Sequence, residues 1–114
     1  MSATVNQSVK FSTAQISDVF TLGNQTIQSI KTEASIGATS FKLQGCDTET
    51  GTFRDIYIVN PDMTTTLFTF LVDANEGRIY SLSTVFPAGE EFLRIVAEGA
   101  VVNGKTITVQ GRGV

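Results

Sequence analysis

Apolar and polar residues alternate along most of this chain, in short runs that end at turn residues. Residues 40–45 alternate cleanly, and residues 53–59 do so apart from one step. Successive side chains of a strand point to opposite faces, so each alternating run predicts a β-strand with one buried face. The predicted strands cover residues 5–11, 19–22, 26–31, 40–45, 53–59, 64–72, 78–86, 91–97 and 105–110.

Turn residues separate these runs. Asn60-Pro61-Asp62 predicts a turn, because proline fixes φ and asparagine and aspartate tolerate tight backbone geometry. Asn103-Gly104 is a hairpin signal, since both central residues of a type I′ turn need positive φ. Residues 12–19 show no 3.6-residue apolar stripe, so we expect no helix there. The pattern predicts an all-β fold: an antiparallel β-sandwich, jelly-roll-like, with about eight strands.

The length predicts a single domain over residues 1–114, because a chain of this size fills one sandwich core but not two. Residues 1–18 are polar, with a strand-like stretch inside them. Two interpretations of this segment stay open. It is either an ordinary first strand of the sandwich or an N-terminal arm that pairs with the sheet edge of a neighbouring subunit.

The run at residues 64–72 is apolar at nearly every position of its second half. A two-layer sandwich has one inner face per sheet, so a strand with apolar residues on both faces is either central and fully buried or carries an interface. A second apolar pair follows near the end of the chain. The interface candidates are Leu67, Phe68, Phe70, Leu71, Val72, Val101 and Val102.

The composition favours strands and excludes most catalytic chemistry. The chain has 16 Thr, 11 Val and 9 Ile, whose branched side chains fit a pleated surface. It has no His, which removes the usual general base and every Ser-His-Asp or Cys-His arrangement. Cys46 is expected to be a small hydrophobe at a strand end, and the eleven acidic residues are scattered. We therefore expect a protein that is not an enzyme and carries no cofactor.

Charge and hydropathy limit the partners. The net charge is −3 and no two Lys or Arg residues are adjacent, so the basic footprint that nucleic acid requires is missing. No apolar stretch reaches the roughly 18 residues of a membrane span. The first residues have neither a charged nor an apolar signal region, so we expect synthesis in a cytosol. The single cysteine fits that compartment.

Two loops carry oxygen-bearing side chains at alternate positions before a glycine, a pattern similar to calcium-binding loops. The same residue types also make ordinary solvated turns, and we expect that role here. No metal is therefore predicted. The weak calcium candidates are Asp47, Glu49, Asp73 and Asn75.

Two segments carry a resemblance to a known family. Residues 41–47 and 51–56 are similar to a hairpin of discoidin-like and galactose-binding-like sandwiches, and Phe92-Leu93-Arg94-Ile95 resembles a late strand of those domains. The likeness covers about residues 40–110. It departs from the family's Asp-Gly pattern, because Thr48-Glu49-Thr50 separates Asp47 from Gly51.

Short, His-free domains with this hairpin also resemble small proteins encoded among bacteriophage virion genes. That resemblance implies a structural virion protein made in the host cytoplasm, most simply a capsid decoration protein that binds and stabilises the assembled shell. Its partners would be other copies of itself and the major capsid protein. The alternative is a small carbohydrate- or ligand-binding module, for which the absence of Trp leaves few stacking platforms.

Overall fold

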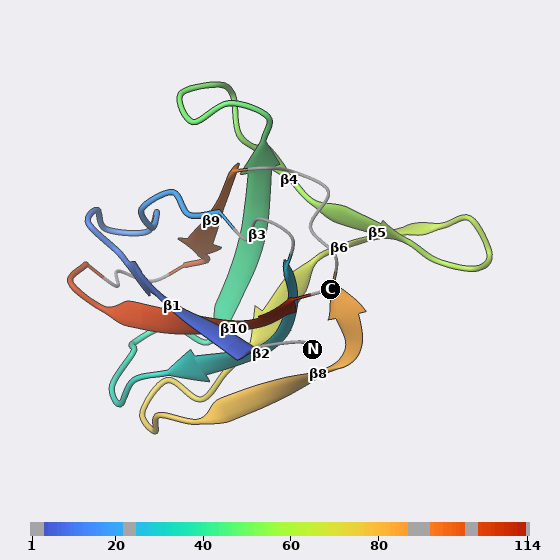
Figure 1. The fold of residues 1–114 in the computed structure, drawn as a ribbon. Coiled ribbons are helices and arrows are strands. Elements are labelled where there is room, and N and C mark those ends of the chain that lie inside the picture. The colour runs from blue at the N-terminus through green and yellow to red at the C-terminus, as the bar shows by residue number, and fades with distance from the viewer. Residues whose placement is uncertain (1–3, 22–24, 87–91, 100–102, 114) are drawn as a thin grey trace.

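The chain folds as antiparallel strands, in a computed structural model that describes residues 4–21, 25–86, 92–99 and 103–113 (Figure 1). All regular elements among these residues are strands, so none of them is a helix that could cross a membrane. The ten strands are β1 (Thr4–Lys10), β2 (Gln25–Thr32), β3 (Ser40–Cys46), β4 (Arg54–Asp55), β5 (Tyr57–Val59), β6 (Thr65–Leu67), β7 (Thr69–Leu71), β8 (Ile79–Phe86), β9 (Phe92–Ala97) and β10 (Thr106–Gly113).

One sheet, sheet A, has the strand order β1-β10-β2-β8, with every pair antiparallel. The register places Val9 opposite Ile107 and Val109 opposite Ile30, so buried side chains of neighbouring strands meet on one face. Residues 4–10 pair along their whole length with β10 of the same chain and form the edge of this sheet.

The second sheet, sheet B, is built around β3. Strand β9 pairs with one edge of β3, while β4 and β7 share the other edge. The segment before β2 extends the sheet beyond β9 through isolated bridges at Ile16 and Phe20. The alternation in β9 buries Leu93 and Ile95 and turns Arg94 outward.

A continuous hydrophobic core lies between the two sheets. It contains Val9, Ile30 and Ile107 from sheet A, and Phe41 and Leu43 from sheet B. Each such side chain stabilises the fold by roughly 1.5–3 kcal/mol when fully buried. The all-β antiparallel sandwich predicted from the alternation is confirmed.

Several predicted details are wrong. Two long predicted strands are each interrupted, at Ile56 and at Phe68, so ten strands form instead of about eight. Residues 19–21 make an isolated bridge in place of a regular strand. Asn103-Gly104 forms a turn, but only Gly104 has a positive φ, of 83°. That turn joins β9 of sheet B to β10 of sheet A, so the connection crosses between sheets and is not a hairpin.

Candidate interaction surface

A two-stranded hairpin leaves sheet B at its edge. β4 and β7 lie end to end along β3, and the chain between them departs as β5, turns, and returns as β6. At the point of departure, Ile56 donates its N–H to Leu43 (3.2 Å) and Phe68 donates its N–H to Ile56 (2.9 Å). Figure 1 shows the hairpin projecting away from both sheets.

The turn of the hairpin is held by local hydrogen bonds. Met63 donates its N–H to the carbonyl of Asn60 (2.9 Å), and Met63 has a positive φ of 71°. The Asp62 carboxylate accepts both the N–H (3.0 Å) and the hydroxyl (2.5 Å) of Thr64. Hydrogen bonding by Thr64, its side chain first, lowers the pKa of Asp62. The turn predicted at residues 60–62 is therefore present, and Asp62 is occupied within it.

The two faces of the hairpin differ in polarity. Tyr57 lies opposite Leu67 and Val59 opposite Thr65, so these four side chains share one largely apolar face. The other face pairs Ile58 with Thr66. There the side chain of Asn60 donates hydrogen bonds to the hydroxyls of Thr64 (3.1 Å) and Thr66 (2.9 Å). The polar side chains of this face are therefore hydrogen-bonded to one another.

The hairpin exposes an unusual share of large apolar side chains. Tyr57 is 56% exposed, Val59 61% and Met63 79%. With Ile58, these make four of the seven large apolar residues that are exposed in the described part of the chain. Single exposed apolar residues are ordinary, but a contiguous group marks an interaction surface.

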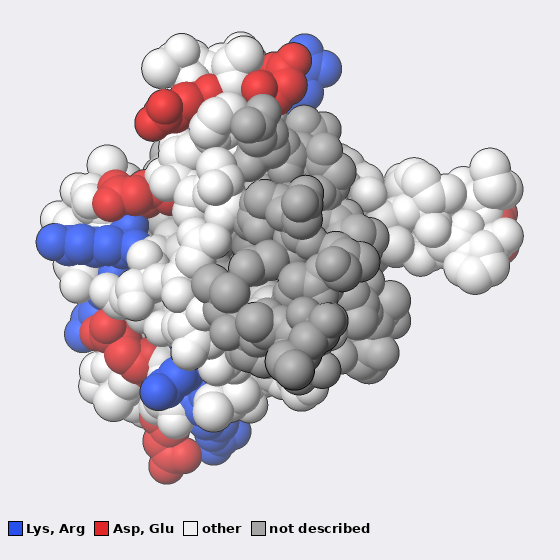
Figure 2. Space-filling view, in the orientation of Figure 1, with Lys and Arg blue, Asp and Glu red and all other residues white. Residues whose placement is uncertain are grey.

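The hairpin and the following strand β7 also carry almost no charged residues. Asp62 is the only charged residue between positions 56 and 72. In Figure 2 the hairpin stands out as a white lobe with red at its tip, while the blue Lys and Arg side chains in view lie on other parts of the surface. An uncharged apolar surface is suited to close contact with another protein, because contact desolvates no ion.

The residues predicted as interface candidates fall into three places. Leu71 is 73% exposed, and Leu67 is half-buried on the apolar face of the hairpin. Phe68, Phe70 and Val72 belong to or pack against the core. The ring of Phe70 stacks on Phe41 with centroids 5.4 Å apart. Val101 and Val102 lie outside the described residues.

Sequence reasoning missed the exposed apolar residues of the hairpin, which are Tyr57, Ile58, Val59 and Met63. A signal for them exists. Residues 56–59 are four consecutive apolar residues, Ile-Tyr-Ile-Val, immediately before a predicted turn. Such a run places apolar side chains on both faces of a strand, the same argument that drew attention to residues 67–72.

The calcium candidates lie in two loops at opposite ends of β3. Asp47 and Glu49 follow the last residue of β3. Asp73 and Asn75 follow β7, which pairs with the first residues of β3. The described residues contain no group of three or more His, Cys, Asp or Glu side chains placed to hold a metal. Asp73 accepts the N–H groups of Asn75 (2.8 Å) and Glu76 (2.9 Å), which lower its pKa, the Glu76 bond most.

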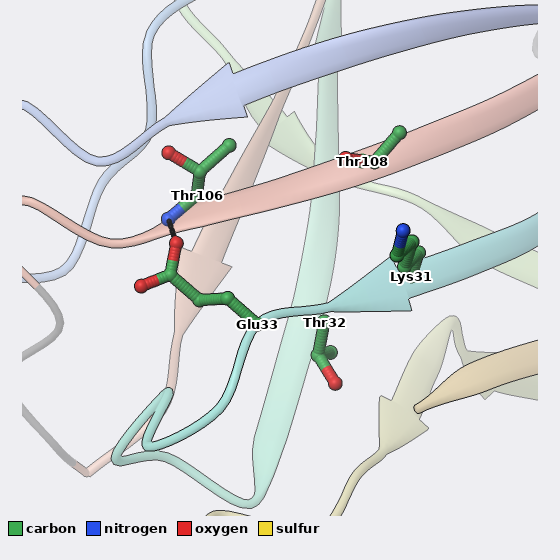
Figure 3. Close-up of a pocket in the computed structure, with 5 residues that line it drawn as sticks. All are labelled: Lys31, Thr32, Glu33, Thr106 and Thr108. Atoms are coloured by element: carbon green, nitrogen blue, oxygen red, sulfur yellow. Dashed lines mark hydrogen bonds between the residues drawn. The ribbon is translucent and has the colours of Figure 1, made fainter. Parts of the chain in front are cut away.

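A small polar hollow lies on sheet A, near the end of β2 (Figure 3). Its volume is about 100 Å³. Glu33 reaches across it to accept the N–H of Thr106 at 3.0 Å, and Lys105 pairs with the same carboxylate at 3.7 Å. The lining residues are Lys31, Thr32, Glu33, Thr106 and Thr108.

A wider hollow of about 720 Å³ adjoins the small one on the side of β8. It shares Lys31, Thr32 and Glu33 and adds residues 34 and 77–79. Neither lining contains an aromatic residue. These hollows offer polar contacts to a small ligand but no ring for a sugar to stack on.

Comparisons with known proteins give only distant likenesses. No protein-family model matches the chain, and no curated protein matches it. The SPBc2 prophage-derived protein YomS has a TM-score of 0.48 at 13% identity, over 99% of this chain and 96% of that chain. The family 32 CBM from C. perfringens NanJ, solved in complex with galactose, has a TM-score of 0.46 at 12% identity, over 96% of this chain and 93% of that one.

A third solved structure, the virus-like particle of the giant freshwater prawn (Macrobrachium rosenbergii) extra small virus, has a TM-score of 0.31 at 15% identity, over 98% of this chain and 77% of that one. The neighbours thus include a prophage protein, a carbohydrate-binding β-sandwich and a viral particle. With such low TM-scores, the three likenesses carry no argument about what this chain does.

Proposed function

We propose that this protein is a non-enzymatic structural protein of a bacteriophage particle, made in the host cytoplasm, that decorates the assembled capsid. The observation that carries the proposal is the projecting β5–β6 hairpin, with Tyr57, Val59 and Met63 largely exposed and a single charge at its turn. Burying apolar surface of this kind contributes roughly 25 cal/mol per Å², so contact with another subunit stabilises the assembly.

The partner of the hairpin is a second copy of this chain. Its apolar face is uncharged, so two copies related by symmetry can bring that face together without like charges meeting. One hairpin offers only part of the roughly 800 Å² per partner that a stable interface buries. A lattice of copies multiplies weak contacts through avidity, and the array is held on the major capsid protein. Binding only to the assembled shell would stabilise that state by mass action.

A non-catalytic role agrees with the side-chain chemistry. The chain has no His, and its single Cys46 is buried. The side chain that most often transfers protons near neutral pH is therefore missing. Hydrolase assays on esters, glycosides and phosphates should therefore give no activity above background.

The alternative function is a small carbohydrate- or ligand-binding module. Its supporting observation is the polar hollow beside Lys31, Glu33 and Thr106. That function predicts saturable binding of a saccharide that weakens on Glu33→Gln, without any need for self-association. Calorimetric titration with galactose and a panel of simple sugars distinguishes the two functions.

The test of the decoration function is co-sedimentation with phage shells that lack the protein. Wild type is compared with the Tyr57→Ser/Val59→Ser variant, and Ile79→Ser is the matched control because Ile79 is as exposed (64%) but lies on β8. We expect the double variant to lose most of its retention on shells and the control to keep it. Equal retention of all three proteins, or retention of none, would contradict the proposal.

A further inference from the structure

A row of polar side chains crosses the outer face of sheet B. Arg94 on β9 lies opposite Gln44 on β3, which lies opposite Asp55 on β4. The Nε of Arg94 donates to the Gln44 side-chain oxygen at 2.7 Å, and the Gln44 amide donates to Asp55 at 2.8 Å. Lys42 completes the row with an ion pair to Asp55 at 3.1 Å. The four side chains are half-buried and form one connected chain of hydrogen bonds.

This row fixes the position of the Arg94 guanidinium. One edge is held by Gln44, and one face lies over the ring of Phe53, 4.5 Å from the ring centre. Gln44 is itself oriented by Asp55, so its oxygen stays directed at Arg94. A guanidinium held on an edge and on a face loses little further freedom when it binds a partner.

The charges along the row do not cancel. Lys42 and Asp55 neutralise each other, and hydrogen bonds from Gln44 and then Lys42 lower the pKa of the Asp55 carboxyl, which keeps it ionised. Arg94 has no ion pair with any acidic residue in the part of the chain that is described. Among the described residues it is therefore an unmatched, half-buried positive charge, in a protein whose net charge is −3.

We propose that Arg94 is a binding site for a carboxylate, supplied by an acidic side chain of a neighbouring protein subunit. Because Nε is engaged by Gln44, the carboxylate binds end-on, with its two oxygens accepting from the two terminal nitrogens. That Arg94 binds a carboxylate does not depend on the role given to the hairpin. That the carboxylate belongs to a protein subunit rests on the proposed function.

The position of Arg94 favours a protein partner over an acidic sugar. It lies on the outer face of sheet B, whereas both hollows described above are lined by residues of sheet A and the loops beside it. Small ligands prefer concave sites that cover most of their surface, while protein partners dock on open faces. The aromatic ring at this site, Phe53, is already covered on one side by Arg94.

The first test is an NMR titration of the arginine Nε–H signals with sodium acetate, against sodium chloride at equal ionic strength. We expect a saturable shift at Arg94 and none at Arg54, an exposed arginine on β4. Arg94→Lys keeps the charge but loses the planar fork, so acetate should bind about tenfold more weakly. Equal responses of Arg94 and Arg54, or no saturation, would overturn the site.

The second test separates the two sources of the carboxylate. Glucuronate should bind no more tightly than acetate if only the carboxylate is recognised, and binding about tenfold tighter would reassign the site to an acidic sugar. In the co-sedimentation assay with phage shells, the Arg94→Gln variant should be retained less than wild type. The melting temperature of this variant should stay close to that of wild type. Acetate binding combined with unchanged retention would overturn the protein partner but leave the hairpin proposal intact.

Discussion

Phe68 donates its backbone N–H to the carbonyl oxygen of Ile56 at 2.9 Å, and this bond closes the base of the β5–β6 hairpin. In a β-turn the carbonyl of residue i accepts from the N–H of residue i+3, so two residues in place of 57–67 would give this bond the spacing of a β-turn bond. The residues between them, 57–67, project from the sheet and add two strands outside the main sheets. The hairpin is thus an insertion between β4 and β7, which together form one edge of sheet B.

This arrangement predicts that the hairpin can be removed without loss of the fold. Replacing residues 57–67 with Asn-Gly supplies a two-residue type I′ turn that keeps the Ile56–Phe68 bond. We expect circular dichroism like that of wild type and an equal or slightly higher melting temperature, because a shorter loop costs less closure entropy. A variant that fails to fold would show that the hairpin is part of the core structure.

The aromatic cluster predicts which apolar residues of this region stabilise the fold. Phe41 is fully buried and contacts the rings of Phe11 and Phe70, with centroids 5.8 Å and 5.4 Å away. Phe41→Ala should cost about 3–5 kcal/mol of unfolding free energy in urea. Leu71→Ala, at an exposed position two residues beyond Thr69 on β7, should change it by less than about 0.5 kcal/mol. Comparable losses would contradict the assignment of core and surface.

Much of this fold was predictable because alternation reports burial directly. β3 and β9 alternate along nearly their whole length, and both were predicted within about two residues of their observed ends. The interruptions at Ile56 and Phe68 were not predictable, because both residues are apolar and continue the runs around them. The break arises from a tertiary event, since β4 and β7 share one edge of β3 and the chain between them must leave the sheet.

The interaction surface was predicted only in part, for a related reason. The sequence shows an excess of apolar residues at positions 67–72. The fold decides which of these side chains face the core and which face outward. Phe70 stacks on Phe41 inside, while its neighbour Leu71 faces outward. The Arg94 row was missed altogether. It joins β3 and β4 to β9, whose Arg94 lies 50 residues after Gln44, and no local pattern marks the register of these strands.

A close backbone approach makes Gly77 a sensitive position. A Cβ atom added there would lie 2.7 Å from the carbonyl oxygen of Thr32 and 3.0 Å from the nitrogen of Ala34. These atoms belong to the backbone and move little, so Gly77→Ala should cost about 1–3 kcal/mol in urea-induced unfolding. Glu76→Ala, an exposed change in the same loop, is the control and should be nearly neutral. A neutral Gly77→Ala would show that the loop adapts.

The turn carboxylate of Asp73 predicts a change of stability in acid. Hydrogen bonds from Glu76 and Asn75 lower its pKa below the ordinary value of 3.8. The ionised Asp73 carboxylate therefore stabilises the folded state fully above that value, and this stabilisation is lost as the pH falls through the lower pKa of the folded state. Asp73→Asn keeps an acceptor oxygen without the charge, so its stability should fall less between pH 4 and more acidic values. Parallel pH profiles of melting temperature for the two proteins would contradict this role.

Calcium should leave the protein unaffected. Asp73 is already bonded within its own turn, and Asp47 and Glu49 lie at the other end of β3. We expect the melting temperature to stay the same in millimolar calcium and after treatment with a chelator. A rise of several degrees with calcium, abolished by Asp73→Asn or Asp47→Asn, would instead make these residues ligands.

The most direct test of the assembly role is the mass of the protein in solution by light scattering over a range of concentrations. Wild type is compared with the Asn-Gly replacement of residues 57–67, after both are shown to be folded. The assembly role predicts that wild type approaches a multiple of the 12.2 kDa chain mass as concentration rises, while the replacement remains a monomer. A wild type that stays at 12.2 kDa throughout, or a replacement that associates equally well, would contradict it.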